Sequence, residues 1–182
     1  PRAEASWKEL PEQVGSIAAT LKKLGLQQGD RAVAYMPNIP QTIAAMLAVA
    51  SQGGIWSVTA PDMGAVGVLD RFRQIEPRIL FAVDGYRYGG RDFDRRDIVR
   101  ELVRQLPTLE AVIFVPYLNP DASIDFEFAE SPERKVRVVS FNEATADPQP
   151  VNFVPVPFSH PLWIVYSSGT TGNDCSLSIK SM

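Results

Sequence analysis

The amino-acid sequence predicts an α/β fold in which helices flank a mainly parallel sheet. Short, continuous apolar runs recur along the chain, and such runs are typical of parallel strands that are covered on both faces. Segments whose apolar residues recur at helical spacing separate these runs. Because consecutive parallel strands need crossover connections, helices that alternate with buried strands indicate one α/β unit.

The first elements are marked by recognisable start and stop signals. Ser6–Glu9 has the S-x-x-E form of a helix entry, or equally of a strand end that runs into the helix, and Gly25 supplies the stop. A strand is expected over residues 31–36. Pro40 suits the first turn of a second helix, over 41–51, which is apolar nearly all round and is therefore expected to be buried against the sheet.

Helices and strands continue to alternate up to residue 115. The expected strands are short and apolar and the expected helices amphipathic, with strands at 55–58, 79–83 and 111–115 and helices around 68–75 and 98–106. Beyond residue 115 the pattern weakens, and 136–141 is the one strand predicted before a last apolar strand at 162–166. The sequence contains no internal repeat.

Composition narrows the classes of protein to consider. With 182 residues, 45% of them hydrophobic and 21% charged, the chain is long and apolar enough for one globular core. The formal net charge is −3, and no block of lysine or arginine suggests nucleic acid or an anionic membrane as a partner. The longest apolar run, 43–50, is too short to cross a bilayer. Cys175 is the only cysteine, so no disulfide or thiolate metal site is predicted, and a reducing cytoplasm fits best.

Several conspicuous side chains are better interpreted as structural. Tyr35 and Trp56 lie at or near strand ends, where core packing outweighs substrate contact. Asp62 is a candidate cap for the third helix. His160 has no visible carboxylate or second ligand nearby, so no metal site is predicted there.

The segment Tyr166–Gly172, YSSGTTG, carries the most information about function. Its glycines let the backbone turn so that several N–H groups converge, and its hydroxyl groups add donors, which suits the β- and γ-phosphates of ATP. Considered only as glycine, serine and threonine after a strand, the segment is also compatible with an ordinary solvated turn. It is not a Walker-type loop, because Gly172 is followed by Asn173 and not by a Lys-Ser pair.

As a complete string, YSSGTTG resembles the phosphate-loop signature Y/T-S/T-S-G-S/T-T-G of the adenylate-forming superfamily of acyl-CoA synthetases, adenylation domains and luciferases. The stretch from ELPEQ to GGIWS is similar to the opening helix, G-D-R-V strand and buried second helix of that superfamily. The strings DRFRQIEP, DGYRYGGR and HPLWIVYSSGTTG look like its acetoacetate–CoA ligase branch. The resemblance covers roughly residues 7–172. It implies that 1–172 is the incomplete front part of the large N-terminal domain, with 173–182 as an anomalous tail.

This resemblance implies an ATP-dependent acid–thiol ligase that forms acetoacetyl-AMP and passes the acyl group to coenzyme A. It implies ATP, coenzyme A and Mg²⁺ as cofactors and acetoacetate as the substrate. Arg87 and Arg91 become candidates for contacting coenzyme A phosphates, with a solvated turn between strand and helix as the alternative. The residues implied to hold the β- and γ-phosphates of ATP are Ser167, Ser168, Gly169, Thr170, Thr171 and Gly172.

Two other functions compete with this hypothesis. One is a neighbouring short-chain acyl-CoA synthetase that acts on acetate or propionate. The other is a nucleotide- or CoA-binding module without catalysis. The chain also departs from the superfamily, which has x-P-K after the loop, whereas Lys180 lies too far along to serve as that lysine. The resemblance therefore implies a piece of a longer enzyme that lacks the ribose-binding acid, the acyl pocket and the catalytic lysine, so no catalytic residue is assigned. With later strands missing, we expect the isolated chain to be poorly soluble or partly unfolded, and inactive.

Overall fold

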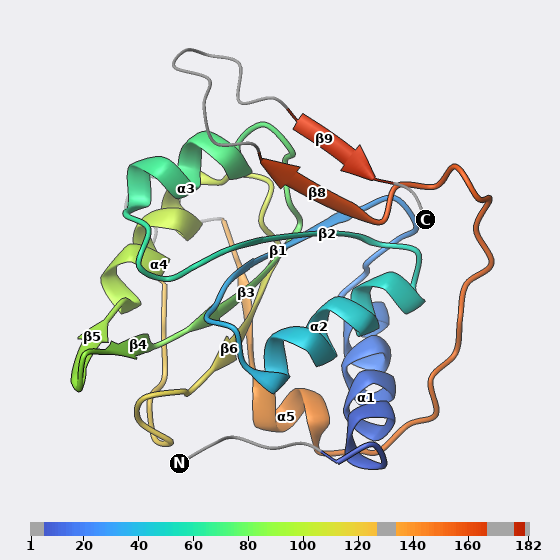
Figure 1. The fold of residues 1–182 in the computed structure, drawn as a ribbon, viewed down its shortest axis with the longest axis horizontal. Coiled ribbons are helices and arrows are strands. Elements are labelled where there is room, and N and C mark those ends of the chain that lie inside the picture. Colours follow the sequence, from blue (N-terminus) through green and yellow to red (C-terminus); the bar gives the residue numbers. More distant parts are fainter. Residues whose placement is uncertain (1–5, 127–133, 167–176, 181–182) are drawn as a thin grey trace.

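The structure, a computed structural model, describes residues 6–126, 134–166 and 177–180. Seven strands form one sheet in the order β7-β6-β3-β1-β2-β8-β9, and all neighbours are parallel except β8 and β9 (Figure 1). The predicted α/β class with a mainly parallel sheet is confirmed. The strands are β1 (Arg31–Tyr35), β2 (Ile55–Thr59), β3 (Ile79–Val83), β6 (Ala111–Val115), β7 (Arg137–Ser140), β8 (Trp163–Tyr166) and β9 (Leu177–Lys180).

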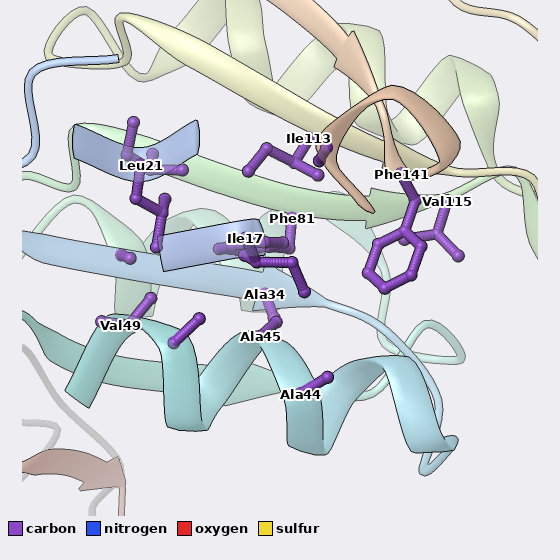
Figure 2. Packing of buried hydrophobic residues seen from close by; sticks show 14 of the residues in the cluster. Ile17, Leu21, Ala34, Ala44, Ala45, Val49, Phe81, Ile113, Val115 and Phe141 are labelled. Atoms are coloured by element: carbon purple, nitrogen blue, oxygen red, sulfur yellow. The ribbon is translucent and has the colours of Figure 1, made fainter. Parts of the chain in front are cut away.

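Helices cover both faces of this sheet, and successive strand residues alternate between two cores. On one face Ile17 and Leu21 of α1 pack with the alanines of α2 over Phe81 and Ile113, as Figure 2 shows. On the other face α3 and α4 pack over Tyr35 and its strand neighbours. The helices are α1 (Glu9–Lys23), α2 (Pro40–Ser51), α3 (Ala65–Phe72), α4 (Arg96–Gln105) and α5 (Phe141–Thr145).

The start and stop signals of α1 are used as predicted. The Ser6 hydroxyl accepts a hydrogen bond from the backbone N–H of Glu9 at 3.1 Å, and the Glu9 carboxylate accepts one from the Ser6 N–H at 2.8 Å. This is the reciprocal pairing of a capping box, and it spans the turn just before α1, whose N-cap residue is Lys8. At the other end Gly25 has φ +89°, and the Leu26 N–H donates to the Leu21 carbonyl at 3.0 Å. This is the Schellman arrangement, which favours glycine at that position.

Helix α2 begins at Pro40, as its sequence indicates, but it is not buried all round. Ala44, Ala45 and Ala48 are fully buried against the sheet, whereas Ile43 and Leu47 are 42% and 38% exposed. The small side chains therefore define the packed face, because they let the helix lie close to the strands.

Arginines near the amino ends of strands satisfy carbonyl groups at the ends of helices or in the turns that follow them. Arg31, the first residue of β1, donates to the carbonyls of Ile75 at 2.5 Å and Glu76 at 2.9 Å, just beyond α3. Arg137 of β7 donates to the carbonyl of Leu24 after α1 at 2.6 Å. Guanidinium groups at helix C-termini replace missing backbone donors and oppose the negative end of the helix dipole.

Residues 147–162, called here the return segment, lead the chain from α5 back to β8 across α1 and the end of α2 (Figure 1). The Ser16 hydroxyl of α1 donates to the Asp147 carbonyl at 2.9 Å. The preceding residue, Gly15, lies so close to the segment that a Cβ there would meet the Gln149 carbonyl oxygen at 1.8 Å. Val154 donates its N–H to the Ser51 carbonyl at the end of α2, at 2.8 Å. The segment is thus fixed although it has no regular secondary structure.

The described residues contain four elements that the sequence did not predict, two of them paired in one hairpin, and a further expectation is corrected. A separate antiparallel hairpin, β4 (Gly85–Tyr88) and β5 (Arg91–Asp94), lies between β3 and α4. Helix α5 is unpredicted too, although its capping box, Ser140 with Glu143, has a visible S-x-x-E form. Strand β9 lies in the expected tail. The expectation that Asp62 caps α3 is wrong, because the N-cap residue is Gly64 and no side chain caps this helix.

Candidate functional site

A pocket lies at the carboxyl ends of the parallel strands, where the chain changes direction across the sheet. The strands β1 and β3 are neighbours, but the chain leaves β1 through α2 towards β2 and leaves β3 through α4 towards β6. Such a switch point is where open α/β sheets usually bind ligands. The carboxyl-edge pocket has a volume of about 530 Å³ and is lined by 37–38, 60–62, Tyr86, Arg87, Tyr88 and Tyr117.

The hairpin of β4 and β5 forms one wall of this pocket. Gly89 and Gly90 connect the two strands with φ values of +57° and +76°, as a tight two-residue turn requires. Across the ladder, the rings of Tyr86 and Phe93 stack with centroids 5.0 Å apart. The expected solvated turn around the two candidate arginines is therefore a hairpin with a defined register.

The hairpin places Arg87 and Arg91 differently. Arg87 lines the pocket, is 55% exposed at its side chain and forms an ion pair with Asp92 across the ladder. Arg91 lies at the hairpin tip opposite Tyr88, is exposed and does not line the pocket. Because adjacent ladder positions point to opposite faces, the two guanidinium groups do not converge on one point.

Arg95 connects the hairpin to the loop that follows β2. Its Nε donates to the Pro61 carbonyl at 2.9 Å and its Nη2 donates to the Tyr86 hydroxyl at 3.0 Å. The guanidinium carbon lies 5.1 Å from the centroid of the Tyr86 ring, within cation–π range. The Pro61 carbonyl also accepts a hydrogen bond from the hydroxyl of Tyr35, at 2.7 Å.

Tyr35 anchors that loop from inside the core. Its side chain is fully buried, and its hydroxyl also contacts the Met63 carbonyl at 2.8 Å. Burial raises the pKa of Tyr35 to about 12, against a smaller opposing effect of the Arg95 cation. The interpretation of Tyr35 and Trp56 as core residues is confirmed, since Trp56 is only 1% exposed.

Asp84 fixes the wall that carries Tyr117. This buried carboxylate follows β3 and accepts hydrogen bonds from the backbone N–H groups of Tyr117 at 2.8 Å and Asn119 at 2.8 Å, and from Leu118 at 2.9 and 3.1 Å. Sequence reasoning missed Asp84, Arg95 and Tyr117. Asp84 had a usable signal, because it is a charged residue directly after a buried strand, whereas the contacts of Arg95 and Tyr117 depend on tertiary packing.

The predicted ATP-phosphate residues 167–172 lie outside the described residues. The strand that leads to them, β8, is parallel to β2 and ends at Tyr166, on the same edge of the sheet as the pocket. The Tyr166 hydroxyl donates to the Arg71 carbonyl of α3 at 2.8 Å, and the Arg71 guanidinium lies 5.7 Å from the Tyr166 ring centroid. Lys180 of β9 pairs with Trp163, at the opposite end of β8 from Tyr166.

Other candidate sites contain no further chemistry among the described residues. His160 contacts the Gly53 carbonyl through Nε2 at 2.9 Å, which agrees with its structural interpretation. Cys175 lies outside the described part of the chain. Within that part, no three His, Cys, Asp or Glu side chains cluster to hold a metal ion. Nor does any helix there have the length and apolar character needed to span a membrane.

This chain was compared with protein families, curated proteins and solved structures. The model of the AMP-binding enzyme family matches residues 2–174. The acetoacetyl-CoA synthetases of Rattus norvegicus and Rhizobium meliloti are 41% and 43% identical over 170 and 169 residues, which are 93% and 92% of this chain and 25% of each relative. The solved acetoacetyl-CoA synthetase of Streptomyces lividans superposes with a TM-score of 0.87 and 48% identity, over 98% of this chain and 26% of that one. The chain thus spans about a quarter of the length of these relatives. Because the family model covers nearly all of its residues, this chain belongs to the family of AMP-binding enzymes.

Proposed function

We propose that this chain is the part of an acetoacetate–CoA ligase that binds the phosphates of ATP and the nucleotide end of coenzyme A. The observation that supports this best is its 48% identity to the acetoacetyl-CoA synthetase of Streptomyces lividans over nearly its whole length. Similarity to the relatives from rat and from Rhizobium meliloti, at 41% and 43% identity, supports the same branch.

The reaction has two steps on one site. The carboxylate of acetoacetate attacks the α-phosphorus of ATP, forming acetoacetyl-AMP and releasing pyrophosphate. The thiol of coenzyme A then gives up its proton to solvent and attacks the acyl carbon, the thioester forms, and AMP leaves with the electron pair of the broken C–O bond. Since the reaction moves charge between phosphate and carboxylate oxygens, orientation and charge neutralisation supply most of the catalysis.

The proposed ATP-phosphate residues are Ser167, Ser168, Gly169, Thr170, Thr171 and Gly172. Their backbone N–H groups and hydroxyls are suitable donors for the β- and γ-phosphates, and β8 leads to them at the carboxyl edge of the sheet. We assign no Mg²⁺ ligands to the described residues, because no three His, Cys, Asp or Glu side chains cluster among them.

The carboxyl-edge pocket is the proposed site for the charged nucleotide end of coenzyme A. Arg87 provides a guanidinium group for a phosphate, and Tyr88 and Tyr117 provide ring faces for a base. Arg91 would provide a second positive charge at the hairpin tip. Residues 173–182 contribute to neither site in this proposal, and the protein would act in the cytoplasm.

A chimaera tests this proposal. Residues 7–172 would replace the matching quarter of the acetoacetyl-CoA synthetase of Rhizobium meliloti, and AMP release would be measured with acetoacetate, ATP and coenzyme A. We expect turnover, and we expect Ser168→Ala with Thr170→Val to raise the KM for ATP. Absence of turnover in a folded chimaera would contradict the proposal.

A second host protein is needed to test which carboxylic acid is the substrate. Grafting the same residues into an acetate–CoA ligase distinguishes the acetoacetate branch from the acetate or propionate alternative. A graft that functions only in the acetate-specific host would move this chain to the neighbouring branch. The isolated chain is proposed to release no AMP with any of the three acids, and measurable AMP release would contradict that.

A further inference from the structure

The hairpin of β4 and β5 is a wall of the carboxyl-edge pocket that does not belong to the seven-stranded sheet. A two-stranded hairpin is only marginally stable by itself, so contacts outside its own ladder must fix its position. At its base, Gly85 packs so closely that a Cβ would meet the Leu118 side chain at 2.5 Å. On the side of the loop after β2, the contacts come from Arg95.

The main chain of Arg95 is held in place by a hydrogen bond. Its N–H donates to the Asp84 carbonyl at 2.7 Å, directly after β3. From there the side chain contacts two walls of the pocket at once, the Pro61 carbonyl at 2.9 Å and the Tyr86 hydroxyl at 3.0 Å. The same guanidinium lies over the Tyr86 ring and, at 6.0 Å, near the Phe93 ring.

The acceptor on the far side is itself immobilised. The Pro61 carbonyl also accepts a hydrogen bond from the hydroxyl of Tyr35, whose side chain is fully buried in the core. The hairpin is therefore tied, through one guanidinium group, to a carbonyl that the core holds in place.

We propose that Arg95 is a positioning residue that latches the hairpin of β4 and β5 to Pro61 and thereby sets the width of the carboxyl-edge pocket. A lysine does not replace it. The guanidinium donates in two fixed directions and lies within 5.1 Å of the centroid of the Tyr86 ring, whereas an ammonium group on a flexible chain cannot reproduce both donor directions at once. Charge alone is therefore insufficient, and the planar fork is required.

The consequence for ligand binding rests on the proposed function. The hairpin carries Arg87 and Tyr88, so a loosened latch moves both away from Pro61 and Tyr117 across the pocket. Coenzyme A should then bind more weakly. ATP should be unaffected, because its proposed phosphate residues follow β8 and not the hairpin.

Hydrogen exchange on the Rhizobium meliloti chimaera that carries residues 7–172 tests the latch without any ligand, in a protein of full length. The amides of β4 and β5 would be compared with those of β1 and β3 in the wild type, Arg95→Met, Arg95→Lys and Arg100→Met. The last variant is a matched control, since Arg100 lies on α4, which follows Arg95 directly, but pairs with Asp97 and Asp125. We expect exchange of the hairpin amides to rise about ten-fold or more in Arg95→Met and nearly as much in Arg95→Lys, with no change in Arg100→Met.

Affinities for coenzyme A and ATP, measured on the same four proteins, separate positioning from general destabilisation. The expected result is a loss of roughly five-fold or more in coenzyme A affinity for both Arg95 variants, with ATP affinity retained. Unchanged exchange in Arg95→Met overturns the latch. Wild-type exchange and wild-type coenzyme A affinity in Arg95→Lys would also overturn it. If the wild type binds no coenzyme A, the proposed function of the pocket fails, while the exchange data still decide the latch.

Discussion

Arg87 and Asp92 face each other across the ladder of β4 and β5, and both oxygens of the carboxylate accept hydrogen bonds from the guanidinium. The Nε–Oδ1 distance is 2.5 Å and the Nη2–Oδ2 distance is 2.9 Å. This bidentate pair uses the same donors that a phosphate would need. The pKa of Asp92 is lowered, chiefly by hydrogen bonding from Arg87, so the carboxylate stays ionised at neutral pH. Asp92 is therefore positioned to compete with a phosphate ligand for Arg87.

Asp92→Asn should strengthen coenzyme A binding by roughly two- to five-fold, because it removes a competing acceptor and a repelling charge from beside Arg87. Calorimetric titration of the chimaera that carries residues 7–172, with and without this substitution, against coenzyme A would measure this. Because a lowered pKa means that the pair is lost only as pH falls through that value, affinity should show no Asp92-dependent change between about pH 6 and 8. Asp97→Asn is the control, since Asp97 is exposed and lies outside the hairpin. Weaker binding by Asp92→Asn would show that the pair orients Arg87 and does not compete with the ligand.

Asp84→Asn should lower the free energy of unfolding by about 2–4 kcal/mol. One buried carboxylate satisfies three backbone N–H groups, and an amide offers one acceptor oxygen in place of two. Urea unfolding followed by tryptophan fluorescence would measure the loss. The exposed Asp97→Asn again serves as the reference. If Asp84→Asn is as stable as Asp97→Asn, the loop after β6 does not depend on this carboxylate.

The buried hydroxyl of Tyr35 predicts an alkaline loss of stability. Because the pKa of Tyr35 is raised to about 12 in the folded chain, its contribution is complete below the unfolded value near pH 10 and is lost as pH rises towards 12. The loss amounts to about 2–3 kcal/mol. Tyr35→Phe should be less stable than the wild type by about 1 kcal/mol at neutral pH, through its lost hydrogen bonds, and more stable above pH 12. Denaturant unfolding across that range would show the crossing, which Tyr88→Phe should lack.

Two glycines in helices should respond oppositely to alanine. A Cβ at Gly15 of α1 would collide with the carbonyl oxygen of Gln149 in the return segment, so Gly15→Ala should cost about 1–3 kcal/mol despite the better helix propensity of alanine. At Gly67 of α3 the nearest atoms belong to the flexible Met63 side chain, at 3.3 Å. Gly67→Ala should therefore be neutral or stabilise the chain by up to about 1 kcal/mol. Thermal unfolding of both variants would compare them. Equal effects at both positions would mean that the return segment yields to the added methyl group.

The strands and helices that bury apolar residues were predictable from the sequence, because burial leaves a periodic pattern. β3 and β6 are fully buried strands, and α4 buries Val99, Leu102 and Val103 at helical spacing. The hairpin of β4 and β5 was not predictable in this way, because its residues are mostly polar and exposed. Its one local signal was the Gly89-Gly90 pair, which marks a tight turn but does not show that the flanking residues pair as strands.

The candidate site likewise contains residues that a local motif predicts and residues that only tertiary packing brings together. The string YSSGTTG alone predicts the phosphate-loop residues, because the function expected of them depends on local backbone geometry, which a short sequence can encode. The pocket beside Arg87 depends on Asp84, Arg95 and Tyr117, which come from three separate segments. Nothing in their local sequence links them.

The sequence by itself determined the α/β class, the order of the buried elements and the resemblance to adenylate-forming enzymes, because periodic burial and a contiguous motif are both local properties. Only the tertiary structure decided the strand order and the pocket at the switch point between β1 and β3. It also decided that Arg87 would be held by Asp92 while Arg95 joins two walls. These depend on side chains far apart in sequence that meet only when the crossover connections bring the carboxyl ends of the strands to one edge.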